Sequence, residues 1–383
     1  MRAGAYRFPV ADGVVFGTPW REALAAEVRR GGFSRVFALV SGSLARAQDL
    51  EAGLRAALGE AFVAIHSGIG AHSPRADVAE AARRAHEAGA DVIVAIGGGS
   101  VIDAAKVMQL CLAAGVFAAD GFDAIVGGGK PVHGQELATR VIALPSTLSG
   151  AEFTAFAGVT DTARRRKERY QHWQMTPLTV ILDPALTRDT PAELWLSTGV
   201  RAIDHAVEDL CSINSQPLAD AASVRALGLL GRALPATRRA PDDLAARLDA
   251  MIGVWLSMVG SQGGVEKGVS HAIGHVLGGT FGVSHGVTSC ITLPHAMRWN
   301  APVIAERLPE IAAALGSPGA DAADVVAELI QGLGLPHSLG AVGVTRDQGA
   351  LLAELTMQDR WTGTNPRKVS GPEDILDILK DAW

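Results

Sequence analysis

The sequence predicts an α/β domain with a parallel sheet, followed by an all-helical domain. Between residues 34 and 182, short apolar runs of strand length alternate with segments of helix length, as in a parallel sheet with crossover helices. From residue 191 onward, segments with helical apolar spacing follow one another and strand-like runs are few. The length of 383 residues also favours two domains, which we place at residues 1–187 and 188–383.

The elements of the first domain follow from its apolar runs. Residues 34–40 and 90–96 are almost wholly apolar and rich in branched side chains, as expected of buried strands. The predicted strands are residues 34–40, 61–65, 90–96, 141–144 and 178–182, and the predicted helices are residues 44–58, 78–88 and 101–112. In the second domain the predicted helices are residues 198–213, 218–234, 244–260, 265–277, 287–298, 303–314, 320–333, 346–356 and 372–382.

The composition excludes several classes of protein. Hydrophobic residues make up 48% of the chain and charged residues 19%, which favours a globular protein with a large core. The net charge of −6 argues against a nucleic-acid partner. The N-terminus lacks the apolar core of a signal peptide, and no uninterrupted apolar stretch is long enough to span a bilayer. Three widely separated cysteines fit a reducing compartment, so we expect a cytoplasmic protein without a membrane partner.

A glycine-rich turn, Gly97, Gly98, Gly99 and Ser100, follows the strand at residues 90–96 and opens a predicted helix. Glycines let a backbone approach a ligand closely, and the free N–H groups of a helix N-terminus suit a diphosphate. Glycines also make tight turns for packing alone, and the turn does not match G-x-G-x-x-G. Asp103 and Lys106 on the first turns of the helix strengthen the ligand interpretation, although an acidic residue is ordinary near a helix start.

A second loop of small residues, PSTLSGAE at residues 145–152, follows the strand at residues 141–144. Ligands of open α/β sheets bind at the carboxyl ends of the strands, so Ser146, Thr147 and Ser149 are candidate ligand contacts. The alternative is a polar loop that caps the next helix.

Four histidines lie within residues 271–295, and three of them have the spacing of a site. His271 and His275 are four residues apart and share a helix face, and His285 begins the next apolar run. We expect Gly278, Gly279 and Gly282 to break the first helix. Three imidazoles around a bend suggest a metal site or a site of proton transfer; the alternative is that each ring is separately buried or capped.

A second helix carries Arg201, His205 and Glu208 at helical spacing. The simpler interpretation of this group is a surface ion pair between Arg201 and either Asp204 or Glu208.

Five motifs together give a resemblance to a known family: GGGSVIDAAK (residues 97–106), PSTLSGAE, DPALT (183–187), RAIDHAVE (201–208) and HAIGHVLGGTFGVSHG (271–286). In this order they resemble the iron-containing (group III) alcohol dehydrogenase superfamily, whose fold is shared by dehydroquinate synthase. The chain is most similar to the maleylacetate reductases. Its small-residue loop has the reductase length, His72 and Pro74 resemble their HxP, and Asn365-Pro366-Arg367 resembles their C-terminal region.

The resemblance implies a dinucleotide-binding first domain and hydride transfer from NADH or NADPH to a carbonyl or activated double bond. It assigns the cofactor to the glycine turn with Asp103, to the small-residue loop, and to Lys167 and Leu186. It matches His205, His271 and His285 to three of the four family metal ligands, and His275 to the histidine beside the nicotinamide.

One departure decides the expected mechanism. The family's fourth ligand, an aspartate, is replaced by Arg201, a permanent cation without a lone pair. The resemblance therefore favours a metal-independent reductase of a small carboxylated substrate. In it His275 or a neighbouring histidine gives the proton, while Arg201 and the other histidines bind the substrate anion and stabilise the developing alkoxide. The alternatives are a metal-dependent alcohol dehydrogenase using three histidines and a lyase of the dehydroquinate-synthase type.

Two further expectations concern the cofactor and the assembly. The first strand ends at Ser41 without a carboxylate that would repel a 2′-phosphate, and Arg46 follows within a turn, so we expect NADPH to be accepted. The alternative is that Ser41 and Ser43 merely cap the helix that follows. We also expect a homodimer.

Overall fold

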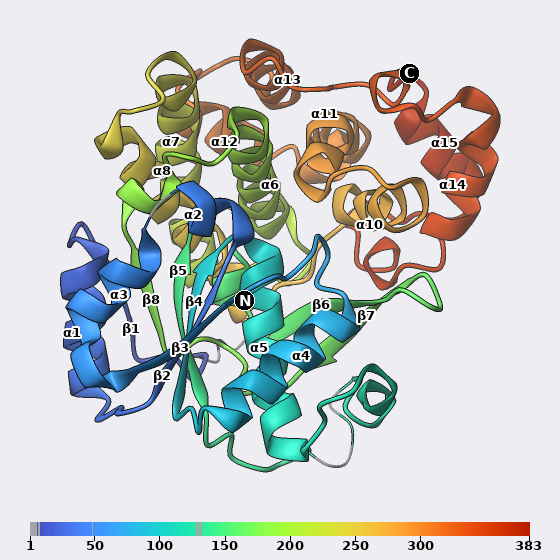
Figure 1. Ribbon diagram of the computed structural model, residues 1–383. Helices are drawn as coiled ribbons and strands as arrows, with labels where there is room; N and C mark the ends of the chain where they lie inside the picture. The colour runs from blue at the N-terminus through green and yellow to red at the C-terminus, as the bar shows by residue number, and fades with distance from the viewer. Residues whose placement is uncertain (1–5, 7, 48, 128, 130–131) are drawn as a thin grey trace. The chain divides into compact units, whose positions relative to one another are not determined.

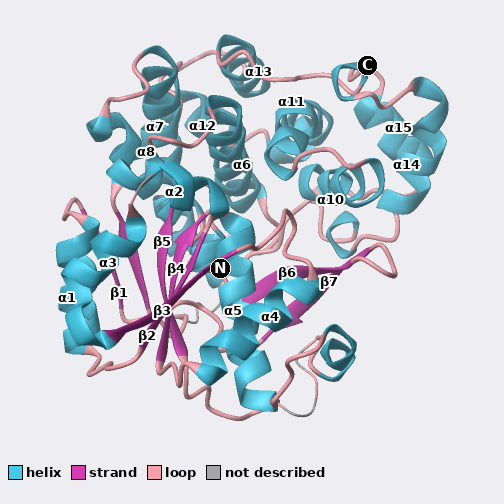
Figure 2. Cartoon of the chain, in the orientation of Figure 1, coloured by secondary structure: helices cyan, strands magenta, loops and turns pink. Residues whose placement is uncertain are grey.

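The chain folds into two compact units. The computed structural model describes residues 6, 8–47, 49–127, 129 and 132–383. An α/β unit spans Pro9–Thr190, and a helical unit comprises Pro191–Trp383 together with Tyr6 and Phe8. The predicted fold class is confirmed: strands and helices alternate in the first unit, and the second is helical (Figures 1 and 2).

The α/β unit is built on a six-stranded parallel sheet. Its strand order is β1-β8-β5-β4-β2-β3, with β4 between β5 and β2. In this register the end of β4 lies beside the end of β5, Gly97 opposite Pro145. The glycine turn and the small-residue loop therefore leave the sheet at neighbouring positions. The strands are β1 (Gly13–Phe16), β2 (Val36–Val40), β3 (Phe62–Ser67), β4 (Val92–Gly97), β5 (Arg140–Pro145) and β8 (Thr179–Leu182).

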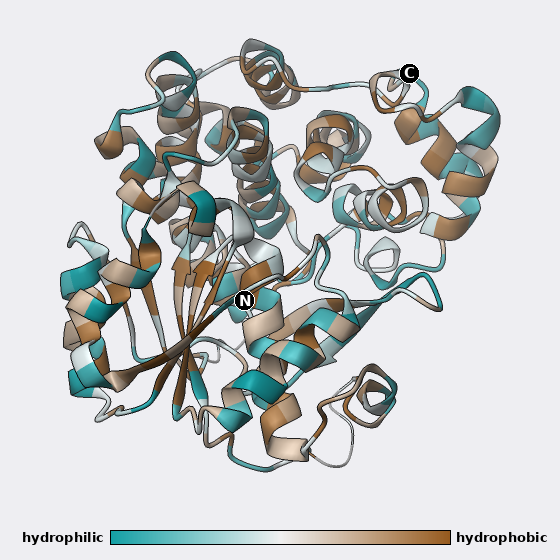
Figure 3. Cartoon of the chain, viewed as in Figure 1, coloured by the Kyte–Doolittle hydropathy of each residue, from teal (hydrophilic) through white to brown (hydrophobic). Residues whose placement is uncertain are grey.

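Helices cover both faces of this sheet. Alternate residues of β2, β4 and β5 belong to two different apolar clusters, one packed with α4 and α5 and the other with α1 and α3. Because both faces are buried, these strands are apolar throughout, and they appear as brown ribbons in Figure 3. The helices are α1 (Trp20–Arg30), α2 (Gly42–Ala47), α3 (Leu50–Leu58), α4 (Arg75–Glu87) and α5 (Gly99–Ala114).

Several elements of the α/β unit differ from the prediction. The expected helix at residues 44–58 is two helices, because Asp49 starts α3 by accepting a hydrogen bond from the Ala52 N–H at 3.0 Å. Strand β1 and helix α1 were not predicted. Neither was the antiparallel hairpin of β6 (Phe156–Asp161) and β7 (Arg166–Gln171). The hairpin alternates buried and exposed residues, and the charges of β7 hide that pattern in the sequence.

The helical unit contains the predicted helices with shifted ends. Helix α6 packs against α7 and α11, and α10 packs against α11 and α14. The stretch Leu244–Gln262, which covers α8 and α9, has the length and composition of a membrane-spanning helix, but half of its apolar window is buried inside the protein. The helices are α6 (Ala192–Cys211), α7 (Pro217–Arg239), α8 (Leu244–Ser257), α9 (Val259–Gln262), α10 (Val269–Phe281), α11 (His285–Ile304), α12 (Leu308–Ala314), α13 (Ala322–Gly332), α14 (Gly349–Thr356) and α15 (Pro372–Leu379).

The expected glycine break within the histidine segment was only partly right. Gly278 and Gly279 lie inside α10, and that part of the prediction is wrong. Gly282 ends the helix in the left-handed conformation, with φ of 70°, which favours glycine. Since α11 begins only three residues later, the two helices follow each other closely and carry His271, His275 and His285 on one short stretch of chain.

Candidate active site

The glycine turn presents open backbone at the start of α5. Gly98 is the N-cap of this helix, and no side chain caps it. A Cβ atom on Gly98 would lie 3.0 Å from the Thr147 methyl carbon, and one on Gly99 would lie 3.0 Å from Ser149 Oγ. The turn is therefore close-packed against the small-residue loop, and only residues without side chains leave the amides accessible.

Two hydroxyl groups beside this turn lack a protein partner. Among the described residues, Thr147 Oγ1 and Ser149 Oγ are buried atoms without a hydrogen bond. Buried polar atoms are normally paired, so unpaired hydroxyls next to a free helix N-terminus fit a bound phosphate. Ser146 is held by its backbone, since its N–H donates to the Gly97 carbonyl at 2.9 Å. The residues present thus suit the diphosphate of a dinucleotide.

Asp103 and Lys106 have structural contacts. Asp103 accepts a hydrogen bond from the Gly158 N–H at 3.0 Å, which ties α5 to β6. Lys106 is fully buried and donates to the Ala151 carbonyl at 2.8 Å, to Thr154 Oγ1 at 2.9 Å and to the Phe156 carbonyl. These contacts shape the loop that carries the free hydroxyls.

The other expected cofactor residues lie at several places in the α/β unit. Ser41 Oγ accepts from the Leu44 N–H at 3.3 Å at the end of β2, and Lys167 is exposed on β7. Leu186 is 1% exposed within an apolar cluster. The Ser100 hydroxyl accepts from the His72 N–H at 3.1 Å. Cofactor contacts by these residues stay predictions.

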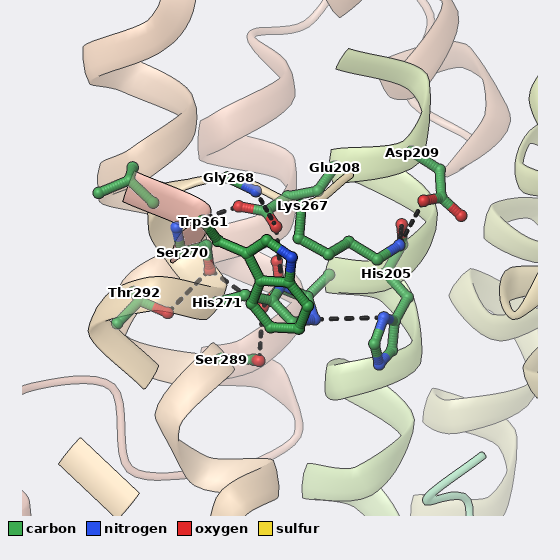
Figure 4. A network of polar contacts seen from close by, with 12 residues as sticks. His205, Glu208, Asp209, Lys267, Gly268, Ser270, His271, Ser289, Thr292 and Trp361 are labelled. Atoms are coloured by element: carbon green, nitrogen blue, oxygen red, sulfur yellow. Dashed lines mark hydrogen bonds and ion pairs between the residues drawn. The ribbon is translucent and has the colours of Figure 1, made fainter. Parts of the chain in front are cut away.

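In the helical unit, His205 of α6 and His271 of α10 form a pair, in which His271 is buried and His205 is half-buried (Figure 4). The distance from His271 Nε2 to His205 Nδ1 is 3.2 Å. On its other side, His271 Nδ1 lies 2.7 Å from a Glu208 carboxylate oxygen and 3.5 Å from Asp204 Oδ2. Burial, with the nearby His271 and Lys267, holds the pKa of His205 well below its ordinary value, so this ring is neutral at physiological pH.

The carboxylates of α6 organise the start of α10. Glu208 accepts from the N–H groups of Gly268 at 2.9 Å and Ser270 at 3.0 Å, as Figure 4 shows. Asp204 accepts from the hydroxyls of Ser270 at 3.0 Å and Ser289 at 2.6 Å. Both acids thus hold α10 and α11 against α6, a role that sequence spacing did not reveal.

Arg201 lies inside this network. Its side chain is 4% exposed; Nη1 donates to Ser289 Oγ at 3.0 Å and lies 3.7 Å from Asp204 Oδ2. The ion pair expected as the simpler interpretation therefore forms with Asp204, but it is buried and not on the surface. Gly274 makes room for it, because a Cβ there would lie 3.3 Å from Nη1. Direct contact of Arg201 with a substrate stays a prediction.

His275 and His285 form a second pair, which is exposed. Their rings stack at a centroid distance of 6.2 Å and an angle of 12°. His275 Nδ1 lies 2.8 Å from Asp359 Oδ2, and the Trp361 ring stacks on the imidazole at 4.6 Å. The Trp361 indole also meets His271 edge-on at 5.3 Å, so it links the His275–His285 pair to the His205–His271 pair. Asp359 and Trp361 were not among the predicted site residues.

Comparison with known proteins identifies the family. The model of iron-containing alcohol dehydrogenases matches residues 11–184, and the C-terminal model of the Fe-containing alcohol dehydrogenase family matches residues 195–383. The chain belongs to the iron-containing alcohol dehydrogenase family. The predicted resemblance is confirmed, and the protein is an oxidoreductase of this family.

Several of the similar proteins are named maleylacetate reductase. Maleylacetate reductase of Sphingobium indicum is 32% identical, covering 98% of this chain and 96% of the relative. Dehydrogenase ALT3 of Alternaria alternata is 35% identical, covering 92% and 99%. The crystal structure of maleylacetate reductase from Agrobacterium tumefaciens matches with a TM-score of 0.85 and 28% identity, covering 100% of this chain and 99% of that one.

The metal-ligand set that the resemblance implies has Arg201 at one position, and a guanidinium supplies no ligand atom. Two of its histidines, His205 and His271, contact each other. A different group, Asp204, Glu208 and His271, brings three ligand atoms within 4.8 Å of one another. Within it, Asp204 Oδ1 has no hydrogen bond among the described residues, whereas Asp204 Oδ2 accepts two and each Glu208 oxygen accepts one from a backbone N–H. The donor atoms alone would suit a metal, but the Arg201 cation 3.7 Å from Asp204 opposes one.

Proposed function

We propose that this protein is a metal-independent, NAD(P)H-dependent reductase of small carboxylated carbonyl compounds, similar to maleylacetate reductase. The observation that carries the proposal is the buried Arg201, which occupies the position of the family's aspartate ligand and pairs with Asp204. A fixed cation there neutralises the buried acid that a divalent metal would otherwise balance. Maleylacetate reductases among the relatives, at 28% to 32% identity, support the same activity.

The α/β unit would hold the cofactor. The amides of Gly98 and Gly99 and the unpaired hydroxyls of Thr147 and Ser149 would bind its diphosphate. When bound, the reduced nicotinamide supplies the hydride that the carbonyl carbon accepts.

His275 is our candidate proton donor. Its Nδ1 faces Asp359, so Nε2 is the atom available to a substrate oxygen. The His275 side chain is 40% exposed, and the protein packed around the rest of the ring lowers its pKa by desolvation although Asp359 opposes this effect. The protonated ring is therefore a stronger acid than an ordinary histidine. We propose that a histidine of this exposed pair gives a proton to the alkoxide that forms when hydride reaches the carbonyl carbon.

The substrate anion needs positive charge that solvent does not screen. Arg201 is a buried cation, and after burial its charge contributes to the lowered pKa of His205 and of His275. Its field favours a negatively charged substrate and a developing alkoxide in the same region. This role does not require that the guanidinium touch the substrate.

The test is the oxidation of NADH and NADPH with maleylacetate, other oxo acids and uncharged aldehydes, with and without chelator. We expect turnover of the oxo acids to exceed that of aldehydes and to persist in chelator, with less than 0.1 equivalent of iron or zinc, an order-of-magnitude bound, in elemental analysis. Stoichiometric metal and activity lost in chelator would instead establish a metal-dependent alcohol dehydrogenase, the alternative that the Asp204, Glu208 and His271 group favours. Stoichiometric consumption of the cofactor excludes a lyase that uses it transiently.

Cofactor choice is a further part of the proposal. A pocket of about 460 Å³ lies between α2, the start of α3 and the end of β3, and its lining includes Arg46, Ser67, Asp49 and Glu51. Asp49 caps α3 and Glu51 pairs with Arg55, so both acids have protein partners. We propose that NADPH is accepted here alongside NADH. A catalytic efficiency with NADPH about a hundredfold below that with NADH, a gap of about 2.7 kcal/mol, would contradict this.

A further inference from the structure

The segment after α14 reaches across to the histidine of α10. The Asp359 N–H donates to the Thr356 carbonyl at 3.0 Å, and its Oδ1 accepts from the Trp361 N–H at 2.9 Å. The second oxygen, Oδ2, lies 2.8 Å from His275 Nδ1. One carboxylate oxygen is thus fixed by the local turn, which leaves the other aimed at the imidazole.

The same turn places an aromatic ring on His275. Trp361 stacks on the imidazole at 4.6 Å with an angle of 30° between the rings. Its indole Nε1 is buried without a hydrogen bond among the described residues, so the ring is held by packing and not by its polar atom. His275 therefore has a polar contact in its ring plane and an aromatic contact on its face.

The segment is anchored independently of His275. The Thr362 hydroxyl donates to the Thr356 carbonyl at 2.6 Å, and the Thr364 hydroxyl donates to the Lys267 carbonyl at 2.7 Å. Asn365 accepts from the Val269 N–H at 3.0 Å and exchanges hydrogen bonds with Asn300. These contacts tie the turn to the start of α10 and to α11, so Asp359 and Trp361 are preorganised relative to the histidine.

We propose that Asp359 and Trp361 are positioning residues that clamp His275 in one tautomer and one ring orientation. Asp359 accepts the proton of Nδ1, which fixes Nε2 as the atom that exchanges a proton with the substrate oxygen. Trp361 restricts rotation of the ring about its side-chain bonds. The inference rests on the proposed role of His275 as the proton donor.

The decisive variant is Asp359→Asn. Its amide oxygen can still accept from the Trp361 N–H, while the amide NH₂ would face Nδ1 and favour the wrong tautomer. Because a positioned general acid contributes about 10²–10⁴-fold, we expect kcat with an oxo acid to fall about a hundredfold. The dissociation constant for NADH should stay within about threefold, and the solvent deuterium isotope effect on kcat should rise. Asp359→Glu should restore part of kcat.

Asp321→Asn is the matched control. Asp321 caps α13 by accepting from the N–H groups of Ala323 and Asp324, so the variant makes the same chemical change at another cap without a histidine. We expect its kcat to match the wild type. Trp361→Phe should keep the stacking and cost less than Trp361→Ala. A kcat of Asp359→Asn within threefold of an active wild type would overturn the clamp.

A second measurement separates this inference from the proposed function. In protein labelled with ¹⁵N-histidine, the His275 ring, identified by its loss in His275→Gln, should show protonated Nδ1 in the wild type and protonated Nε2 in Asp359→Asn. If the wild type reduces no carbonyl compound, the proposed function fails, but the tautomer change still supports the clamp. An unchanged tautomer would overturn the clamp whatever the activity.

Discussion

The glycine turn and the histidine cluster are built on opposite principles. The histidine cluster is the group of His205, His271, His275 and His285 with the charged side chains that surround them. The turn consists of four successive residues and lies beside one loop. Together they offer a ligand backbone amides and small hydroxyl groups. The cluster gathers side chains from α6, α10, α11 and the turn after α14, and His275 lies 84 positions before its partner Asp359. A site made of backbone can be recognised in a contiguous motif, whereas a site made of charges depends on partners that the fold supplies.

The two regions also differ in charge. The small-residue loop beside the turn offers neutral hydroxyls, and those of Thr147 and Ser149 have no hydrogen-bond partner among the described residues, as expected where a ligand will complete the contacts. The cluster contains buried ion pairs: Arg201 with Asp204, and Lys267 with Asp209. Disturbing the cluster should therefore affect folding as well as activity, while disturbing the turn should affect cofactor binding alone.

The largest effect is expected from the buried Lys267–Asp209 pair. Lys267→Met leaves the Asp209 carboxyl group in the core without its ion-pair partner, which should reduce the free energy of unfolding by about 3–5 kcal/mol. Replacing both partners, in Lys267→Met with Asp209→Leu, should recover much of this loss. Urea unfolding followed by circular dichroism measures both. The exposed pair of Arg55 and Glu51 is the control, and Glu51→Gln should change stability little. Equal losses from Lys267→Met and Glu51→Gln would show that the cluster is not internally balanced.

Arg201 tests the link between charge balance and chemistry. Arg201→Ala removes the cation beside Asp204 and should lower kcat/KM for a carboxylated substrate. The expected loss of transition-state stabilisation is about 2–4 kcal/mol. Arg201→Asp should lose similar activity and gain affinity for a divalent metal. Steady-state kinetics with and without chelator, and metal titration by calorimetry, provide the measurements. Ser289→Ala removes only the hydroxyl contact and should cost less. Turnover of Arg201→Ala within a few-fold of the wild type would require another cation in the mechanism.

Glu152 gives the α/β unit a pH-dependent stability. Burial raises its pKa to about 7, from an ordinary value of 4.5. The folded state therefore retains this proton while the unfolded state loses it, so the contribution to stability is fully present below pH 4.5 and is lost as the pH rises to 7. The loss is on the order of 3 kcal/mol. Glu152→Gln should flatten this part of the curve of melting temperature against pH. The exposed Glu60→Gln should not, and identical curves for wild type and Glu152→Gln would contradict the prediction.

The smallest effect is expected at the glycine turn. In Gly98→Ala the new Cβ meets the Thr147 methyl at 3.0 Å, so the loop must shift by a few tenths of an ångström. We expect the KM for the cofactor to rise about tenfold, or 1.4 kcal/mol, with little change in kcat or melting temperature. Gly332→Ala in α13, where a Cβ meets nothing within 4 Å, is the control. A fall in kcat without a change in KM would place the turn outside cofactor binding.

Local patterns predicted the parts of the fold that are buried on both sides. The β4 sequence is apolar at every position because helices cover both faces of the sheet, so its strand and the following turn could be recognised. Hairpin β6–β7 was not predicted because its buried positions alternate with arginines and lysine. Helix α1 was not predicted because its charged residues interrupt a narrow apolar stripe around Leu24.

For the histidine cluster, spacing identified the imidazoles but not what holds them. His271 and His275 share a helix, so their proximity follows from the helical repeat. Asp359 and Trp361 come from the turn after α14, and nothing in their local sequence indicates a histidine partner. The pairing of His205 with His271 and of His275 with His285 likewise depends on how α6, α10 and α11 pack.

Gly274 gives the arginine its space. A Cβ at position 274 would lie 3.0 Å from Thr288 Oγ1 and 3.3 Å from Arg201 Nη1, so a side chain there would force these neighbours to shift. The charge of Arg201 is matched by Asp204. An aspartate at position 201 would instead add a third carboxylate beside Asp204 and Glu208, and the network would then have to take up a proton or a cation. The residue at position 201 therefore sets whether this buried network attracts an anion or a cation.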